Sequence, residues 1–202
     1  MIASTSSVYG DAETLPTPED TQPRPVSPCG VTEVAVDHLA RIYWRNFGVP
    51  TVCLRYFTVY GPRQRPDMAF NRLIRQAIAE EDFEIFGDGN QTRDFTFVSD
   101  AVIGTVSAAL AGAPGSAYNI GGGSRRSLNS VLDMLGELMG GRVAGRYGAR
   151  QIGDARDTAA DIDRARRDLG FEPYVDLEPG LKAQLDWQRA SMASPQPLLS
   201  GR

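Results

Sequence analysis

Cys29 and Glu33 are the side chains with the clearest potential for chemistry, and they lie four residues apart on a predicted helix. A free thiol has a pKa of about 8.5, and an ionised carboxylate nearby raises it further by disfavouring the thiolate. The only histidine is His38 and the only other cysteine is Cys53. That set offers neither the cysteine–histidine arrangement of a hydrolase nor a metal cluster. The residues therefore favour Cys29 as a small apolar residue at a helix start over Cys29 as a nucleophile.

Hydroxyls and arginines form a second group of candidate ligands. Thr5, Ser6 and Ser7 follow a short β-prone start, and Thr58 follows a second predicted strand. Lys182 is the only lysine, so almost all basic charge is arginine, whose planar fork matches phosphate and carboxylate groups. A high-GC genome would produce the same arginine bias. On pattern alone, Thr58 is as consistent with a structural hydroxyl as with a ligand.

Elements that would position these groups follow from hydrophobic periodicity and turn residues. Residues 30–47 have the apolar spacing of an amphipathic helix that stops at Gly48, and residues 51–57 form a buried strand. This is a strand–helix–strand unit of the parallel α/β kind. Further helices are predicted at 68–80, from a cap at Ser99 or Asp100 to about 111, from a cap at Ser127 to about 139, at 161–169 and at 178–190. Further strands are predicted at 83–86 and 117–120.

The composition of the chain limits the classes of molecule that it is expected to bind. The chain has 202 residues, 42% of them hydrophobic, with a net charge of −4 and a pI near 5.1. Nothing in that balance favours nucleic acid or an anionic membrane as partner. Without a signal peptide or a long apolar run, the sequence predicts a cytoplasmic protein. No G-x-G-x-x-G run is present, and the turn at residues 121–123 indicates a flexible connection rather than a phosphate cradle.

Three ordered blocks carry a family resemblance: STSSVYG (4–10), LRYFTVYGPRQRPDMAF (54–70) and GDGNQTRDFTFV (87–98). They resemble the NAD-dependent epimerase/dehydratase family of extended short-chain dehydrogenases/reductases, and the second block most resembles UDP-glucuronate 4-epimerases. The resemblance reaches to about residue 190. It implies that Met1 falls near the fifth strand of the family's Rossmann domain, so that the chain lacks the first strands and the glycine-rich turn.

The implied fold is α/β. Residues 1–57 would be a remnant of the Rossmann-like parallel sheet, with about 94–112 packing back on it. Residues 58–190 would form a smaller mixed α/β domain that binds the UDP-sugar, and 191–202 a disordered tail.

The resemblance also implies roles for individual residues. Thr5 matches the family's catalytic Ser/Thr, whereas Cys29 and Glu33 stand where the family has its catalytic tyrosine and the lysine that lowers the tyrosine pKa. We therefore expect impaired turnover, since a thiol is several ångströms shorter than a phenol. Implied substrate ligands are Ser6, Ser7, Thr58, Arg65, Arg93, Arg150 and Asp154, and implied cofactor contacts are Tyr56 and Phe57. The implied cofactor is NAD, although without a glycine-rich loop we do not expect this chain alone to bind it.

Other functions remain open at this point. The chain would be an impaired epimerase that keeps part of a UDP-sugar site, a non-catalytic partner of a full-length epimerase, or a gene remnant without function. Family members often dimerise through the helix that bears the tyrosine. Helix 30–47 is therefore the candidate surface for a homodimer or heterodimer.

Overall fold

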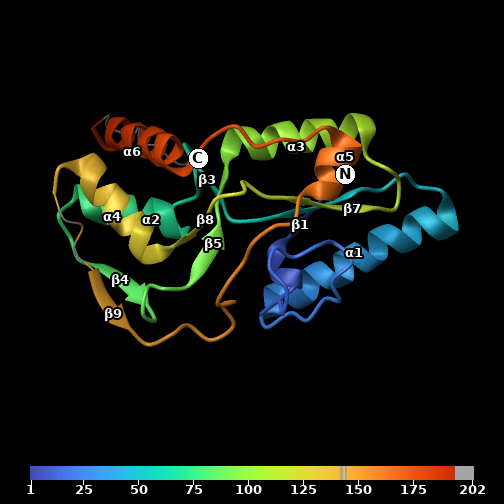
Figure 1. Cartoon of the computed structure of the whole chain (residues 1–202), viewed down its shortest axis with the longest axis horizontal. Coiled ribbons are helices and arrows are strands. Elements are labelled where there is room, and N and C mark those ends of the chain that lie inside the picture. The colour runs from blue at the N-terminus through green and yellow to red at the C-terminus, as the bar shows by residue number, and fades with distance from the viewer. Residues whose placement is uncertain (142, 144, 194–202) are drawn as a thin grey trace, which may run out of the picture.

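The computed structural model describes residues 1–141, 143 and 145–193. Its first unit is a parallel three-stranded sheet in the order β1 (Ile2–Thr5), β2 (Cys53–Tyr56), β7 (Ala117–Ile120). Thr5 pairs with Tyr56 and Tyr56 with Ile120, so the three strands end at the same edge. Helix α1 (Pro28–Phe47) lies on one side of these strands, and α3 (Val98–Ala111) and α5 (Asp163–Leu169) lie on the other (Figure 1). The predicted parallel α/β fold is confirmed.

Local chemistry sets the bounds of α1. The Ser27 hydroxyl accepts a hydrogen bond from the Gly30 amide at 3.1 Å, and Pro28 occupies the first turn, where its missing N–H costs nothing. The helix ends at Gly48, whose φ of 68° is left-handed and free of the penalty that a Cβ would bring. The predicted helix over 30–47 is therefore confirmed, with a start two residues earlier.

A second unit packs beside the sheet and is rich in helices (Figure 1). Its helices are α2 (Ala69–Ile78), α4 (Leu128–Met139) and α6 (Leu177–Ala193). Short strands pair two by two: β3 (Val59–Tyr60) with β6 (Thr96–Phe97), β4 (Phe83–Phe86) with β9 (Gly145–Gly148), and β5 (Thr92–Asp94) with β8 (Arg125–Ser127). Only the last of these pairs is antiparallel. A one-turn helix, η1 (Ser6–Val8), follows β1 in the first unit.

Two hydrophobic cores correspond to the two units. The first joins side chains of the parallel sheet to α5, with Leu54, Tyr118 and Phe171 wholly enclosed. The second surrounds Tyr60 and Phe70, whose rings meet edge to face with centroids 5.4 Å apart. The predicted boundary at residue 57 assigns β7 and α5 to the substrate domain, whereas their side chains contribute to the first core. The division into two domains stays a prediction.

Three local predictions need correction. Neither Ser99 nor Asp100 caps α3, which begins at Val98 without a side-chain cap. The Asp100 carboxylate is buried and accepts hydrogen bonds from the amides of Tyr174 and Val175 instead. Residues 191–193 continue α6 rather than starting the tail, and the rest of the predicted disordered tail, 194–202, lies outside the described residues. In the described part of the chain, no helix has the length and apolar character needed to span a bilayer.

The first two glycines of the turn after β7 are tightly packed rather than open. A Cβ on Gly121 would collide with Ala160, and one on Gly122 would collide with the Phe95 carbonyl. The Asp94 carboxylate also accepts a hydrogen bond from the Gly122 amide at 2.9 Å. Glycine is required here for the close crossing of two backbones, which is the third difference from the flexible turn that the sequence predicts.

Candidate functional site

A cavity of about 370 Å³ opens at the carboxyl ends of β1 and β2. In open parallel α/β sheets ligands bind outside these strand ends. Its walls come from the end of β1 with η1, the end of β2, the segment before α1, the loop after β9, Met68 before α2 and Arg93 of β5 (Thr92–Asp94). The lining residues predicted from the sequence are Thr5, Ser6, Ser7, Tyr56, Phe57, Thr58, Arg93 and Asp154.

Two of the hydroxyls at the end of β1, those of Thr5 and Ser7, are hydrogen-bonded to each other. Thr5 Oγ1 accepts a hydrogen bond from the Ser7 amide and donates one to Ser7 Oγ, both at 3.2 Å. Thr58 also lines the cavity, two residues beyond β2, and its carbonyl accepts a hydrogen bond from the Thr96 amide at 2.9 Å. The hydroxyls of Thr5, Ser7 and Thr58 can each donate a hydrogen bond to a polyhydroxylated ligand and accept one from it.

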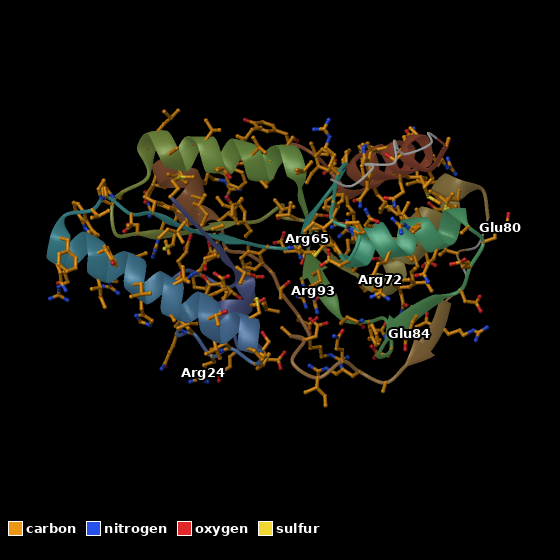
Figure 2. The ribbon with its side chains drawn as sticks, turned by 180° about the vertical axis from the view of Figure 1, so that it is seen from behind. Arg24, Arg65, Arg72, Glu80, Glu84 and Arg93 are labelled. Carbon is orange, nitrogen blue, oxygen red and sulfur yellow. The ribbon has the colours of Figure 1, made fainter. Side chains whose placement is uncertain are left out.

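Arg93 is the one cation that lines this cavity among the residues the structure describes. Its Nη1 donates to the carbonyls of Thr92 at 2.8 Å and Arg156 at 2.9 Å, which fixes the guanidinium plane. Its Nη2 meets the Asp154 carboxylate at 2.7 Å. Figure 2 shows Arg93 near the middle of the molecule and Arg24 at its margin. A fixed fork facing a cavity is suited to a diphosphate.

Two predicted ligands lie apart from the cavity wall. Arg65 is exposed, pairs with Asp67 at 3.0 Å and donates at 3.6 Å to the sulfur of Met68, which does line the cavity. Arg150 lines a neighbouring cavity of about 120 Å³, where it donates to the Asp154 carbonyl at 3.2 Å and contacts Asp11 at 3.8 Å. The structure therefore brings together the predicted hydroxyls, Arg93 and Asp154, but it does not bring Arg65 to them.

Cys29 and Glu33 lie on α1 outside the lining of the cavity. Cys29 is exposed in the first turn, and Glu33 is half-buried one turn later. One carboxylate oxygen of Glu33, Oε2, is buried and has no hydrogen-bond partner. Tyr56 and Phe57 reach the cavity wall, and the Tyr56 hydroxyl is hydrogen-bonded to Thr105 at 2.6 Å.

The lining residues that were not predicted are Gly10, Val26, Ser27, Val59, Met68, Gly153, Ala155 and Thr158. Gly153 lies against the backbone of Val26 and Ser27, so two loops distant in sequence close one side of the cavity. Ser27 carries a recognisable helix-cap signal, but nothing in the sequence pairs it with the loop at 153.

A parallel sheet covered on both faces, with a polar cavity at its carboxyl edge, defines a Rossmann-type α/β protein. The chain belongs to the NAD dependent epimerase/dehydratase family, whose model matches residues 1–121.

Similar proteins include the uncharacterized UDP-glucose epimerase YtcB of Bacillus subtilis, which is 42% identical over 188 residues covering 92% of this chain and 58% of the relative. The UDP-glucuronate 4-epimerase of Thermodesulfobacterium geofontis is 36% identical over 194 residues, covering 95% and 59%. The chain thus spans about three fifths of the length of these relatives.

Solved structures of similar proteins support the same family assignment. The UDP-glucuronic acid 4-epimerase of Bacillus cereus, in complex with UDP-glucuronic acid and NAD, superposes with a TM-score of 0.91 at 43% identity, covering 94% of this chain and 60% of that one. MoeE5 in complex with UDP-glucuronic acid and NAD gives 0.89 at 47% identity, covering 94% and 64%.

Proposed function

We propose that this chain binds a UDP-sugar, UDP-glucuronate or a close analogue, in the cavity at the ends of β1 and β2. The observation that carries the proposal is the presence in one cavity of a fixed guanidinium and several hydroxyls, two of them hydrogen-bonded to each other. A volume of about 370 Å³ lies within the usual range of small-molecule sites. The similarity to enzymes crystallised with UDP-glucuronic acid supports this choice.

The two chemical groups of the cavity divide the ligand between them. Arg93 would hold the diphosphate through its Nη2 edge, which Asp154 must first release. Thr5, Ser6, Ser7 and Thr58 would hold the sugar and its carboxylate. Since Arg65 does not itself line the cavity, the carboxylate would be bound by the neutral hydroxyl donors.

We further propose that the chain has lost the proton-transfer step. A general base must come within about 2.6–3.2 Å of the proton that it removes. Cys29 is exposed on the helix surface, and its thiol ends one bond beyond Cβ. Glu33 contributes a carboxylate, so it cannot lower the pKa of a nearby acid as a lysine would. The hydroxyl of Thr5 alone is a poor base.

The residues present fit NAD poorly. In the family NAD accepts and returns a hydride, and a dinucleotide requires glycines that let its pyrophosphate approach a helix N-terminus. In the described residues, the glycine-rich turn at 121–123 is filled at Gly121 and Gly122 by other protein atoms. We therefore assign no reaction step to the cofactor in this chain.

Calorimetric titration with UDP-glucuronate, UDP-glucose and UDP tests the binding proposal. We expect saturable heat with each, and no heat with any of them would reject it. Incubation with UDP-glucuronate and NAD⁺ tests the catalytic proposal, and we expect no UDP-galacturonate. The double variant Cys29→Tyr with Glu33→Lys is expected to stay inactive for lack of a dinucleotide cradle. Product from the unaltered chain would contradict this reasoning.

A second candidate function, a non-catalytic partner subunit, is favoured by the outer face of α1. Large apolar side chains recur there at helical spacing and are exposed to between 47% and 70%: Val31, Leu39, Ile42, Tyr43 and Phe47. Such a patch is typical of a protein–protein interface. Light scattering should show a homodimer of the chain alone or a complex after mixing with a full-length relative. Leu39→Glu should abolish this association. If the protein stays monomeric, both alone and when mixed with a full-length relative, this function is excluded.

A further inference from the structure

Arg55 is a buried charge that does not line the proposed ligand cavity. It lies on β2, and its side chain is only 9% exposed. Its Nε donates to Asp37 of α1 at 2.8 Å, and its Nη1 donates to the Tyr9 hydroxyl at 2.8 Å and to the Glu19 carbonyl at 2.9 Å. One side chain therefore connects the sheet, α1, the segment after η1 and the loop before α1.

Tyr9 is held from several sides. Its hydroxyl accepts from Arg55 and donates to Asn119 Oδ1 at 2.7 Å, while the guanidinium carbon lies 5.0 Å from the ring centroid. Asn119 is itself fixed, because its amide donates to the Glu19 carboxylate and its Nδ2 to the Thr17 carbonyl, both at 2.9 Å. A phenol with these contacts has one position in the fold.

That position determines where the cavity hydroxyls lie. Tyr9 ends η1, and its amide donates to the Ser6 carbonyl at 3.1 Å, while the Gly10 amide donates to the Ser7 carbonyl at 3.3 Å. The other side of Ser7 is blocked, since Gly30 of α1 leaves no room for even a Cβ beside the Ser7 carbonyl. The Thr5–Ser7 segment is therefore clamped between α1 and the Tyr9 anchor.

We propose that Arg55 and Tyr9 are positioning residues that set the selectivity of the site for the sugar. The proposal rests on the proposed function in so far as it concerns ligand. Hydrogen-bonding groups must be held within about 0.5 Å of their productive geometry. Arg93 belongs to β5 and is fixed by carbonyls of its own, so loosening Tyr9 affects the contacts to the sugar and leaves the contact to the diphosphate intact.

Tyr9→Phe, with Tyr118→Phe as matched control, tests the ligand part. Tyr118 is also wholly buried in the first core, and its hydroxyl accepts from the Ala113 amide at 3.1 Å and donates to the Asp168 carboxylate at 3.5 Å, so neither bond involves η1. For each variant, calorimetry gives the ratio of the Kd for UDP to the Kd for UDP-glucuronate. We expect Tyr9→Phe to lower this ratio about three- to tenfold, which corresponds to the loss of one hydrogen bond to the sugar. The Kd for UDP should stay within about twofold of the wild-type value.

Tyr118→Phe should leave the ratio unchanged although it also loses a buried hydroxyl. Arg55→Lys, which keeps the charge but not the fork, should lower the ratio as Tyr9→Phe does. Equal ratios in the Tyr9 and Tyr118 variants would overturn the proposal, because the effect would then be one of general stability.

Amide hydrogen exchange tests the positioning role without any ligand. Tyr9→Phe should speed exchange at Ser7 and Gly10 and leave Ala113 unchanged, whereas Tyr118→Phe should do the reverse. If the wild type binds neither UDP nor UDP-glucuronate, the proposed function fails while this measurement still decides the positioning role. Wild-type protection at Ser7 and Gly10 in the Tyr9 variant would overturn it.

Discussion

Replacing Arg93 by alanine is expected to weaken UDP binding by about ten- to fiftyfold. A hydrogen bond to a charged group contributes about 1.5–3 kcal/mol, and about 1.4 kcal/mol corresponds to a tenfold change in Kd. Two carbonyls already occupy Nη1, so the diphosphate gains mainly the Nη2 edge that Asp154 holds in the free protein. The Asp154 carboxylate is 53% exposed, so its release into water costs little, about 0–1 kcal/mol.

The assay is calorimetric titration with UDP at low and moderate salt, since contacts between exposed charges weaken with ionic strength. Arg24→Ala is the matched control, because Arg24 also forms an ion pair, with Glu13, but lies at the molecule's margin (Figure 2). It should change the Kd less than twofold. An Arg93→Ala protein that binds UDP as tightly as the Arg24 variant would refute the role of Arg93 as the phosphate ligand.

Three further predictions concern the scaffold. In native protein at pH 8 only the thiol of Cys29 should react with a chromogenic disulfide, because burial raises the pKa of the Cys53 thiol to about 12. In urea both thiols should react, and two reactive thiols in native protein would contradict this prediction. Gly122→Ala should lower the free energy of unfolding by at least about 2 kcal/mol, whereas Gly141→Ala, with open space around it, should change it by less than about 0.5 kcal/mol; equal denaturation midpoints would refute the packing argument. Burial raises the pKa of Tyr9 from 10.0 to about 12, so its contribution to stability is complete below pH 10 and is lost as pH rises towards 12; urea denaturation at pH 9 and 11.5 should show a smaller loss for Tyr9→Phe than for the wild type.

Where the determinants are local, the sequence was sufficient to predict the fold. Helix α1 has its hydroxyl cap, its proline and its terminal glycine within its own segment, and the turn at 87–90 contains the two glycines with positive φ that it needs. The hydroxyls at 5–7 and Arg93 were predicted through ordered family motifs, and the structure places them in one cavity.

Where partners are distant in sequence, prediction failed. Asp100 has the composition of a helix cap, but its hydrogen-bond donors lie 74 and 75 residues later, so α3 starts without it. Strand β9 contains two glycines and was not predicted, since it is defined by its pairing with β4. Arg65, also predicted as a ligand, is exposed outside the cavity lining and pairs with Asp67, so its role as a ligand stays a prediction.

Determining the structure of this chain with UDP-glucuronate is the most direct test of the claim that it keeps a UDP-sugar cradle. We expect the diphosphate within hydrogen-bond distance of Arg93, with Asp154 displaced, and the sugar carboxylate among the hydroxyls of Thr5, Ser6 and Thr58. A second cavity, of about 520 Å³, lies between α1 and the end of β2 that is remote from the hydroxyls. A nucleotide bound there, or a cavity at Arg93 left empty at saturating ligand, would contradict it.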